Sequence, residues 1–433
     1  MHLFENIVIL MAVAIALLRL TRRFVVPYPT MLALAGVIVA LTPWSPQVHI
    51  DPALALALFI APALGEAAFD FSWRDLTRRW WPLVALAFFA VILSTVAVAW
   101  VGVTFGGLPL VAAVALGAIV APPDAAAAVA VLGRFDLPES IVAVLKGESL
   151  LNDAVALLIF ASAVALASNT VSIADAAPQI ALAAPGGILL GMVAGRVYAL
   201  IYPHIDGTLS GTMAGIVATF GVWLAAERLH LSPILAAVAS TMVVAHYMRG
   251  LQTAHDRVLS QVVWSAVVFV LNVLAFLLIG LQAREIVVAS STEELVRALA
   301  FAGVVFAVIV AVRVVWVFAH APRTSVKERL VIGWCGMRGL VTLATALALP
   351  ANFPGRELVV FTAFVVTLGT LVVQGLTLGP LIRFLRVGED ASLDARVARA
   401  RVSLIDAALD ALEDDPTDGA NFLRRRYRAE KAI

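Results

Sequence analysis

The chain has 433 residues, of which 62% are hydrophobic and 14% are charged, and its mean hydropathy is +0.98. A soluble protein cannot cover its surface with so few polar residues, so this composition excludes one and predicts an integral membrane protein. The formal net charge of +1 gives no reason to expect a nucleic-acid partner, and the single Cys335 excludes an intrachain disulfide and a cysteine-based metal site.

Apolar segments long enough to cross a bilayer follow one another along nearly the whole chain, and none alternates as a barrel strand does. Helices satisfy their backbone hydrogen bonds within one segment, so the pattern predicts an all-α membrane protein with about thirteen transmembrane helices. The predicted spans are residues 5–20, 25–42, 52–69, 81–105, 109–132, 140–167, 180–202, 208–229, 232–248, 257–281, 294–319, 327–349 and 356–385.

Basic residues between the spans predict the orientation. Arg22 and Arg23 follow the first span, and most other loop arginines and lysines share their side of the membrane. The positive-inside rule then places the N-terminus outside and the C-terminus in the cytoplasm of a multi-pass protein of the inner (plasma) membrane. Lys146, Arg196 and Arg313 fall within spans, and we expect them either near helix ends or with their side chains reaching along the helix toward the membrane surface.

Residues 388–433 form a polar tail that we expect in the cytoplasm. Residues 392–412 space apolar side chains at helical intervals among charges, which predicts an amphipathic helix. The arginines between 424 and 428 either face solvent or touch anionic lipid.

Two predicted spans carry residues that interrupt a helix. The fifth contains Pro122 and Pro123, which lack a backbone N–H group, followed by Asp124. The twelfth contains several glycines around Arg338. These spans occupy matching positions if the chain consists of two inverted six-helix repeats around the seventh span. Discontinuous helices 5 and 12 in such positions are typical of a transporter's substrate site.

The sixth span carries the most polar stretch expected inside the bilayer, Gly-Glu-Ser-Leu-Leu-Asn-Asp at residues 147–153. At helical spacing, Glu148 lies above Asn152 and Ser149 lies above Asp153, so the four side chains form one stripe. A charge at bilayer depth costs about 3 kcal/mol even on lenient insertion scales, so a carboxylate there indicates a functional site.

Four acids therefore lie well inside the predicted spans, with Arg338 as the base among them: Glu66, Asp124, Glu148 and Asp153. We expect Glu148 to pair with Arg338 and so fix the broken twelfth helix against the sixth. Asp153 then binds either a proton or a cation, because a buried carboxylate with neither is strongly disfavoured.

Competition between a proton and a metal ion for Asp153 is a mechanism for exchange. Hard oxygen ligands suit Na+, K+ or Li+, and the sequence offers the Asp153 carboxylate, the Ser149 hydroxyl, Asp124 and backbone carbonyls near Pro123. Asp124 is equally suited to capping the half-helix that follows it. One titrating group in each cycle predicts a one-for-one, electroneutral exchange.

At these residues the chain resembles the monovalent cation:proton antiporter family, of the sodium/proton exchanger type, and its bacterial electroneutral branch in particular. The resemblance rests on five segments in order, namely residues 64–70, 122–124, 147–153, 333–339 and 372–377. The chain departs from the family pattern at Pro123, where many relatives have a threonine. A hydroxyl ligand is therefore lost there, and only the backbone carbonyl of Pro123 remains.

The resemblance implies a fold, an assembly and a set of roles. It implies a homodimer in a lipid membrane, with a transmembrane domain over residues 1–387 and a tail over 388–433. A dimerisation part, about 1–80 and 180–290, would face a moving core of about 81–170 and 294–387. It implies no cofactor.

The same resemblance assigns roles to individual residues. Asp153 would carry the ion and the proton, with Ser149 as its co-ligand and Asp124 as support near the ion. Glu66 would lie near the cytoplasmic access path. The remaining residues would form a structural cluster, namely Glu148, Asn152 and Arg338.

Other functions remain open at this point. A K+-selective cation/proton antiporter has the same ligands, because selectivity depends on cavity size. A membrane-embedded aspartyl enzyme using Asp124 and Asp153 leaves the break at Arg338 unexplained. A channel would pass cations without a counter-moving proton, and an exchanger of organic anions would not release protons when Na+ is added.

Overall fold

The computed structural model describes residues 11–12, 15–17, 19, 27–42, 51–70, 85–133, 135, 137, 139–167, 173–205, 208–282, 292–320, 325–387, 391–412 and 417–431. Within these ranges the regular structure is helical throughout, which confirms the predicted fold class. The predicted first span, 5–20, lies mostly outside the described residues, as do Arg22, Arg23 and the side chain of Lys146.

The helices of the first half follow the predicted spans closely. They are α2 Tyr28–Ala40, α3 Pro52–Asp70, α5 Ala90–Thr104, α6 Leu110–Val120, α7 Ala125–Leu132, α8 Glu139–Ala167, α9 Ile173–Ile201 and α10 Thr208–Arg228. A π-helical turn, Ala85–Phe89, leads into α5.

The second half continues in the same way. Its helices are α11 Pro233–Leu251, α12 Ala254–Leu281, α14 Thr292–His320, α15 Val326–Trp334, α16 Leu340–Leu347, α17 Arg356–Gly369, α18 Gly375–Leu385, α19 Ala391–Ala411 and α20 Asp418–Lys431. A second π-helical turn, Thr370–Gln374, joins α17 to α18.

Seven helical segments in the described ranges are long and apolar enough to cross a membrane, and four shorter apolar helices accompany them. The exact count of thirteen spans is not confirmed. The predicted fifth and twelfth spans are each divided into two short helices, α6 with α7 and α15 with α16. Both predicted interruptions are therefore present.

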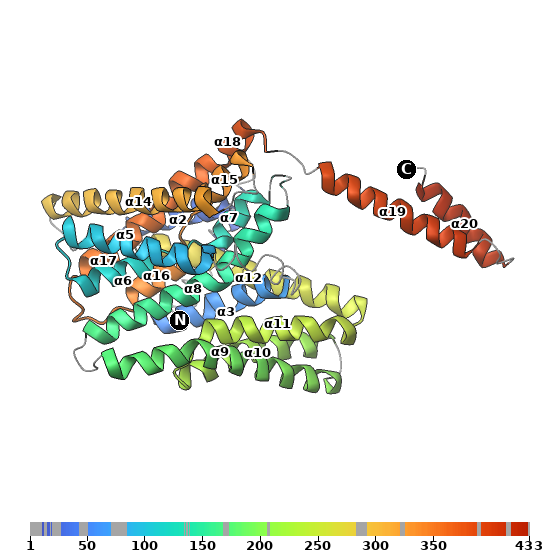
Figure 1. The fold of residues 1–433 in the computed structure, drawn as a ribbon, viewed down its shortest axis with the longest axis horizontal. Coiled ribbons are helices and arrows are strands. Elements are labelled where there is room, and N and C mark those ends of the chain that lie inside the picture. The colour runs from blue at the N-terminus through green and yellow to red at the C-terminus, as the bar shows by residue number, and fades with distance from the viewer. Residues whose placement is uncertain are drawn as a thin grey trace. The chain divides into compact units, whose positions relative to one another are not determined.

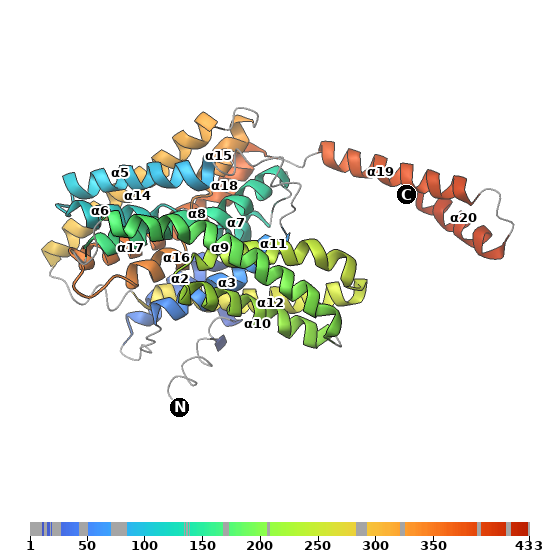
Figure 2. The same cartoon turned by 60° about the horizontal axis from the view of Figure 1, so that its bottom comes forward.

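The helices from α2 to α18 form one compact unit, and α19 with α20 form a second. Within the first unit, α9, α10 and α11 lie together on one side, while α5 and α14 lie on the opposite side (Figures 1 and 2). Long-range packing joins α2 to α12 and α6 to α8. The broken helices thus lie beside α8, which carries the polar stripe.

The second unit is a pair of helices lying side by side (Figure 1). The predicted tail helix is confirmed as α19, and the arginines that follow belong to α20. Exposed ion pairs join the two, Arg401 with Glu430 at 2.7 Å and Lys431 with Asp406.

Candidate functional site

The break between α6 and α7 follows from its two prolines. Pro122 and Pro123 supply no N–H group, so the last carbonyls of α6 lose their helical partners. Asp124 then caps α7, because its Oδ1 accepts a hydrogen bond of 2.8 Å from the Ala126 amide. An acceptor in this position satisfies one of the free amides at a helix start. The capping role considered for Asp124 is present in the structure.

The break between α15 and α16 lies directly against the first one. The Asp124 amide donates a 2.7 Å hydrogen bond to the Met337 carbonyl, so the two interrupted segments touch through their backbones. Gly339 makes this approach possible, since a side chain there would occupy the space of the Asp124 carboxylate. The two breaks thus form one junction in the interior of the bundle.

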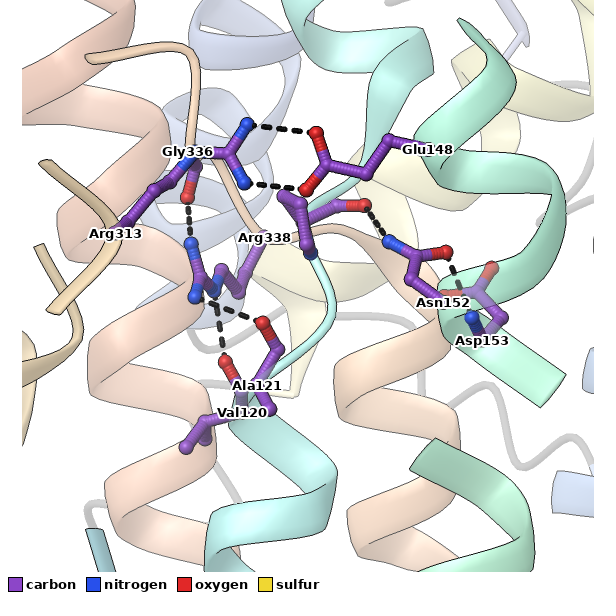
Figure 3. A network of polar contacts seen from close by, with 9 residues as sticks. Val120, Ala121, Glu148, Asn152, Asp153, Arg313, Gly336 and Arg338 are labelled. Carbon is purple, nitrogen blue, oxygen red and sulfur yellow. Dashed lines mark hydrogen bonds and ion pairs between the residues drawn. The ribbon is translucent and has the colours of Figure 1, made fainter. Parts of the chain in front are cut away.

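Arg338 fills the junction with a buried positive charge. Its Nε donates to the Val120 carbonyl at 2.8 Å and its Nη2 to the Ala121 carbonyl at 3.0 Å, while its Nη1 donates to the Gly336 carbonyl (Figure 3). The carbonyls of Val120 and Ala121 lie at the C-terminal end of α6, where the helix dipole favours a cation. Arg338 therefore supplies donors to two carbonyls that the interruption of the helix leaves without helical partners.

The predicted pairing of Glu148 with Arg338 is wrong. Glu148 on α8 accepts two hydrogen bonds from Arg313 on α14, at 2.5 Å from Nη1 and 3.0 Å from Nη2 (Figure 3). The two side chains are 1% and 5% exposed, so this is a buried bidentate ion pair. The expectation that Arg313 lies near a helix end with its side chain reaching the membrane surface is also wrong, because Arg313 lies inside α14 and turns inward to pair with Glu148.

Asn152 connects α8 to the first break. Its Nδ2 donates a 3.0 Å hydrogen bond to the Pro123 carbonyl, and its Oδ1 accepts one of 2.7 Å from the Asp153 amide (Figure 3). Asn152 is fully buried. The amide therefore holds the Pro123 carbonyl and the backbone of Asp153 in fixed positions relative to each other, and it occupies one of the two lone pairs of that carbonyl.

A cavity of about 360 Å³ contains the remaining acids, and we call it the ion cavity. Asp153 and Ser149 reach it from α8, Asp124 from the first break and Glu66 from α3. Asp153 is 5% exposed, and Glu66 accepts a 2.7 Å hydrogen bond from Ser265 on α12. Three carboxylates and a hydroxyl thus line one space, although no three of the described acidic, histidine or cysteine side chains lie close enough together to hold one metal ion.

The ion cavity contains acidic side chains without basic partners, whereas the junction contains a buried arginine. Among the described residues, no lysine or arginine forms an ion pair with Asp124 or Asp153. The two buried bases are used elsewhere, Arg313 by Glu148 and Arg338 by backbone carbonyls. The excess negative charge therefore lies in the ion cavity, where a proton or a cation can neutralise it.

Sequence reasoning missed two residues of this network. Arg313 carried a signal, because an arginine within an apolar helix needs a buried partner unless it reaches the membrane surface. Thr370 carried none. Its hydroxyl accepts a 2.9 Å hydrogen bond from the Arg338 amide and donates one to the Thr367 carbonyl, which ties the second break to the π-helical turn.

A family model described as "Sodium/hydrogen exchanger, transmembrane" matches residues 8–384 of this chain. A Mycobacterium tuberculosis protein named an uncharacterized Na(+)/H(+) exchanger is 32% identical, over 94% of this chain and 79% of its own length. The Na(+)/H(+) antiporter NhaH of Halobacillus dabanensis is 28% identical, over 88% of this chain and 97% of its own length.

A relative with a broader name is also similar. The sodium, potassium, lithium and rubidium/H(+) antiporter of Bacillus pumilus is 28% identical, over 96% of this chain and 66% of its own length. Among solved structures, the sodium proton antiporter MjNhaP1 of Methanocaldococcus jannaschii superposes with a TM-score of 0.68 at 18% identity. The match covers 90% of this chain and all of that one, so the fold is shared.

Proposed function

Because this chain belongs to the sodium/hydrogen exchanger family, we propose that it exchanges Na+ for H+, one for one, with Asp153 as the shared carrier. At the coarser level the chain is a multi-pass membrane transporter that exchanges cations for protons, and it is not an enzyme. The observation that carries the proposal is the meeting of Asp153, Ser149, Asp124 and Glu66 in the ion cavity.

The proposed mechanism follows from burial. A carboxylate that is 5% exposed cannot stay charged without a positive partner, so Asp153 binds H+ or Na+ in turn. If the site changes its exposure between the two sides only when Asp153 is neutralised, each passage carries one of the two ions. Exchange then proceeds without leakage of either ion.

The proposed cation ligands are the carboxylates of Asp153 and Asp124, the Ser149 hydroxyl and the Pro123 carbonyl. Ser149 and Asp153 are four residues apart on α8, so both face the ion cavity. The Pro123 carbonyl keeps a second lone pair beside the one that Asn152 occupies. A ligand set of oxygen atoms suits an alkali cation.

The proposed one-for-one stoichiometry rests on the Glu148–Arg313 pair. This pair has no net charge, and the Asp124 carboxylate is held at the start of α7 by its hydrogen bond from the Ala126 amide. Asp153 then remains as the group that changes partner in each cycle. Under this proposal the transport rate does not depend on membrane voltage.

A K+-selective antiporter is the second proposal for the same site. The relative named a sodium, potassium, lithium and rubidium/H(+) antiporter supports it, because a similar chain bears a broader name. The lining residues are compatible with either ion, and the relative rates with Na+, Li+ and K+ decide between them.

The test uses proteoliposomes with a pH-sensitive dye inside, to which Na+, Li+ and K+ are added separately at several pH values. Wild type is expected to release protons on addition of Na+, and Asp153→Asn to release none. Asp51→Asn is the matched control, because Asp51 caps α3 at the surface and asparagine caps a helix equally well. Exchange at the wild-type rate in Asp153→Asn would refute the proposal.

A second pair of variants, both on α8, tests whether the Ser149 hydroxyl is a cation ligand. Ser149→Ala is expected to raise the half-saturating Na+ concentration by about tenfold, equivalent to about 1.4 kcal/mol, which is the size of one lost polar contact. Ser162→Ala removes a hydroxyl that bonds only to the Leu158 carbonyl of its own helix, and the same parameter should stay at its wild-type value.

The proposal extends to assembly and orientation. We place the N-terminus outside, the C-terminus in the cytoplasm and the protein in the plasma membrane as a homodimer. We propose that the core, about residues 81–170 and 294–387, moves against the dimerisation part, about residues 1–80 and 180–290. Fluorescent-protein and phosphatase fusions to each terminus test the orientation, and the mass of the detergent complex tests the dimer.

A further inference from the structure

Two neutral polar side chains line the ion cavity and have no part in the exchange as proposed above. Tyr28 begins α2, and Asn272 lies within α12. Both are half-buried, and neither the Tyr28 hydroxyl nor the Asn272 amide makes a hydrogen bond within the part of the chain that the structure describes. A polar group inside a helix bundle normally has a partner, so both groups are available to a ligand in the cavity.

The aromatic contacts of Tyr28 bring its side chain to Asn272. Phe269, Asn272 and Phe276 follow one another at spacings of three and four residues, so they share one face of α12. The centroid of the Tyr28 ring lies 5.6 Å from that of Phe269 and 6.2 Å from that of Phe276. The tyrosine therefore lies across this face, with the asparagine between its two aromatic partners.

Two glycines fix the register of α2 against α12. The backbones meet at Gly36 and Gly280, where a side chain on either residue would overlap the backbone of the other helix. Tyr28 precedes Gly36 by eight residues, and Asn272 precedes Gly280 by the same number. The two polar groups therefore lie at the same level of the bundle, and close packing leaves the helices little freedom to shift.

The acidic side chains do not complete a cation site by themselves. No three of the described acidic, histidine or cysteine side chains are close enough together to hold one metal ion. Hard cations in proteins are surrounded by about six or more oxygen atoms. Further ligands therefore have to join the four groups proposed above, which are Asp153, Asp124, Ser149 and the Pro123 carbonyl. Neutral oxygen atoms add ligands without adding to the excess negative charge of the ion cavity.

We propose that the Tyr28 hydroxyl and the Asn272 amide oxygen are cation ligands and determine which alkali cation the ion cavity prefers. This inference rests on the proposed exchange of cations for protons. A water molecule moves to fit a cation of any radius, whereas an oxygen atom held by packed helices does not. Tyr28 and Asn272 are held in this way, so they favour one cation size, that of Na+ under the proposed function.

The first test measures exchange in proteoliposomes with Na+, Li+ and K+ added separately. Tyr28→Phe removes one oxygen atom and keeps the ring between Phe269 and Phe276, and Asn272→Leu replaces the amide with an apolar group of similar size. Each variant is expected to raise the half-saturating Na+ concentration by about tenfold and that of K+ by less than about threefold. The preference between the two ions therefore shifts toward K+.

Tyr427→Phe is the control for the loss of a phenol oxygen. Tyr427 lies on α20, in the second unit of the chain, and is not among the residues that line the ion cavity. This variant should keep the wild-type half-saturating concentrations of all three cations.

The second test detects cation binding without transport. Thermal unfolding of the purified protein is recorded in one detergent with Na+ or K+, and choline chloride keeps the ionic strength constant. A ligand that binds only the folded protein raises Tm by an amount that grows with its affinity. Na+ is expected to raise the Tm of wild type and Tyr427→Phe more than that of Tyr28→Phe and Asn272→Leu. It should not raise the Tm of Asp153→Asn.

Two results would overturn the inference. One is a wild-type ratio of the Na+ and K+ half-saturating concentrations in both Tyr28→Phe and Asn272→Leu. The other is an equal rise for all three cations, which would indicate a change in packing or access instead of a lost ligand. In both cases the proposed function would stand, because Asp153→Asn tests it separately. Normal exchange in Asp153→Asn would refute the proposed function and this inference with it.

Discussion

The Glu148–Arg313 pair permits a quantitative test of the charge arrangement inside the bundle. Glu148→Gln removes the negative partner and leaves the Arg313 guanidinium, 5% exposed, without a counter-charge. Of the two charge-assisted hydrogen bonds, one is lost because the glutamine NH2 group cannot accept, and the other loses its carboxylate; such bonds contribute about 1.5–3 kcal/mol each. The sum of about 3–6 kcal/mol overlaps the cost of about 3–5 kcal/mol for removing one member of a buried ion pair.

The assay is a double-mutant cycle on purified protein in one detergent, with stability measured by thermal unfolding. Glu148→Gln and Arg313→Met are each expected to lower the free energy of unfolding by about 3 kcal/mol or more. The double variant removes both charges and should be destabilised by much less than the sum. For a chain of this size, 3 kcal/mol corresponds to a shift in Tm of about 3 °C.

Arg338 provides the control for the same cycle. Arg338→Met breaks its bonds to the carbonyls of Val120 and Ala121 and is expected to be destabilising by itself. Its coupling to Glu148→Gln should stay below about 1 kcal/mol, because no hydrogen bond joins the two side chains. A larger coupling of Glu148 with Arg338 than with Arg313 would refute the reasoning.

Three further predictions follow from the geometry. Gly339→Ala places a methyl group in the space of the Asp124 carboxylate, which costs about 1–3 kcal/mol through overpacking and should abolish exchange in the vesicle assay. Gly303→Ala is the control, because its methyl group has free space and the variant should transport normally. Gln374→Leu should raise Tm, because both polar atoms of this fully buried amide lack a partner among the described residues; a lower Tm would indicate bound water. Deletion of residues 388–433 should leave exchange intact in vesicles, because α19 and α20 form a unit of their own; lost activity in a protein that still folds would contradict this.

Most of the fold could be predicted because its causes are local in the sequence. Runs of apolar residues determine where helices cross a membrane, and Pro122 and Pro123 remove the amides that would continue α6. The polar stripe on α8 was predicted from helical spacing alone, and the structure confirms that Ser149 and Asp153 lie on one face of this helix. Features that depend on a single helix were therefore predictable.

The partners of the buried charges were less predictable because they depend on how helices rotate against each other. Arg313 lies on α14, which is apolar on every side, so its sequence does not indicate the face that turns inward. The sequence analysis paired Arg338 with a carboxylate, because every residue has a backbone carbonyl and the sequence does not show which carbonyls accept hydrogen bonds from an arginine. The structure gives Arg338 the carbonyls at the end of α6 instead.

These two corrections change the electrostatic argument for exchange. With Glu148 matched to Arg338, Arg313 would have remained a free positive charge that could neutralise Asp153 or Asp124. With Glu148 matched to Arg313, and Arg338 bound to backbone dipoles, both bases are fixed in the scaffold. Under the proposed function, the acids of the ion cavity then depend on mobile positive charge, which a proton or a cation supplies.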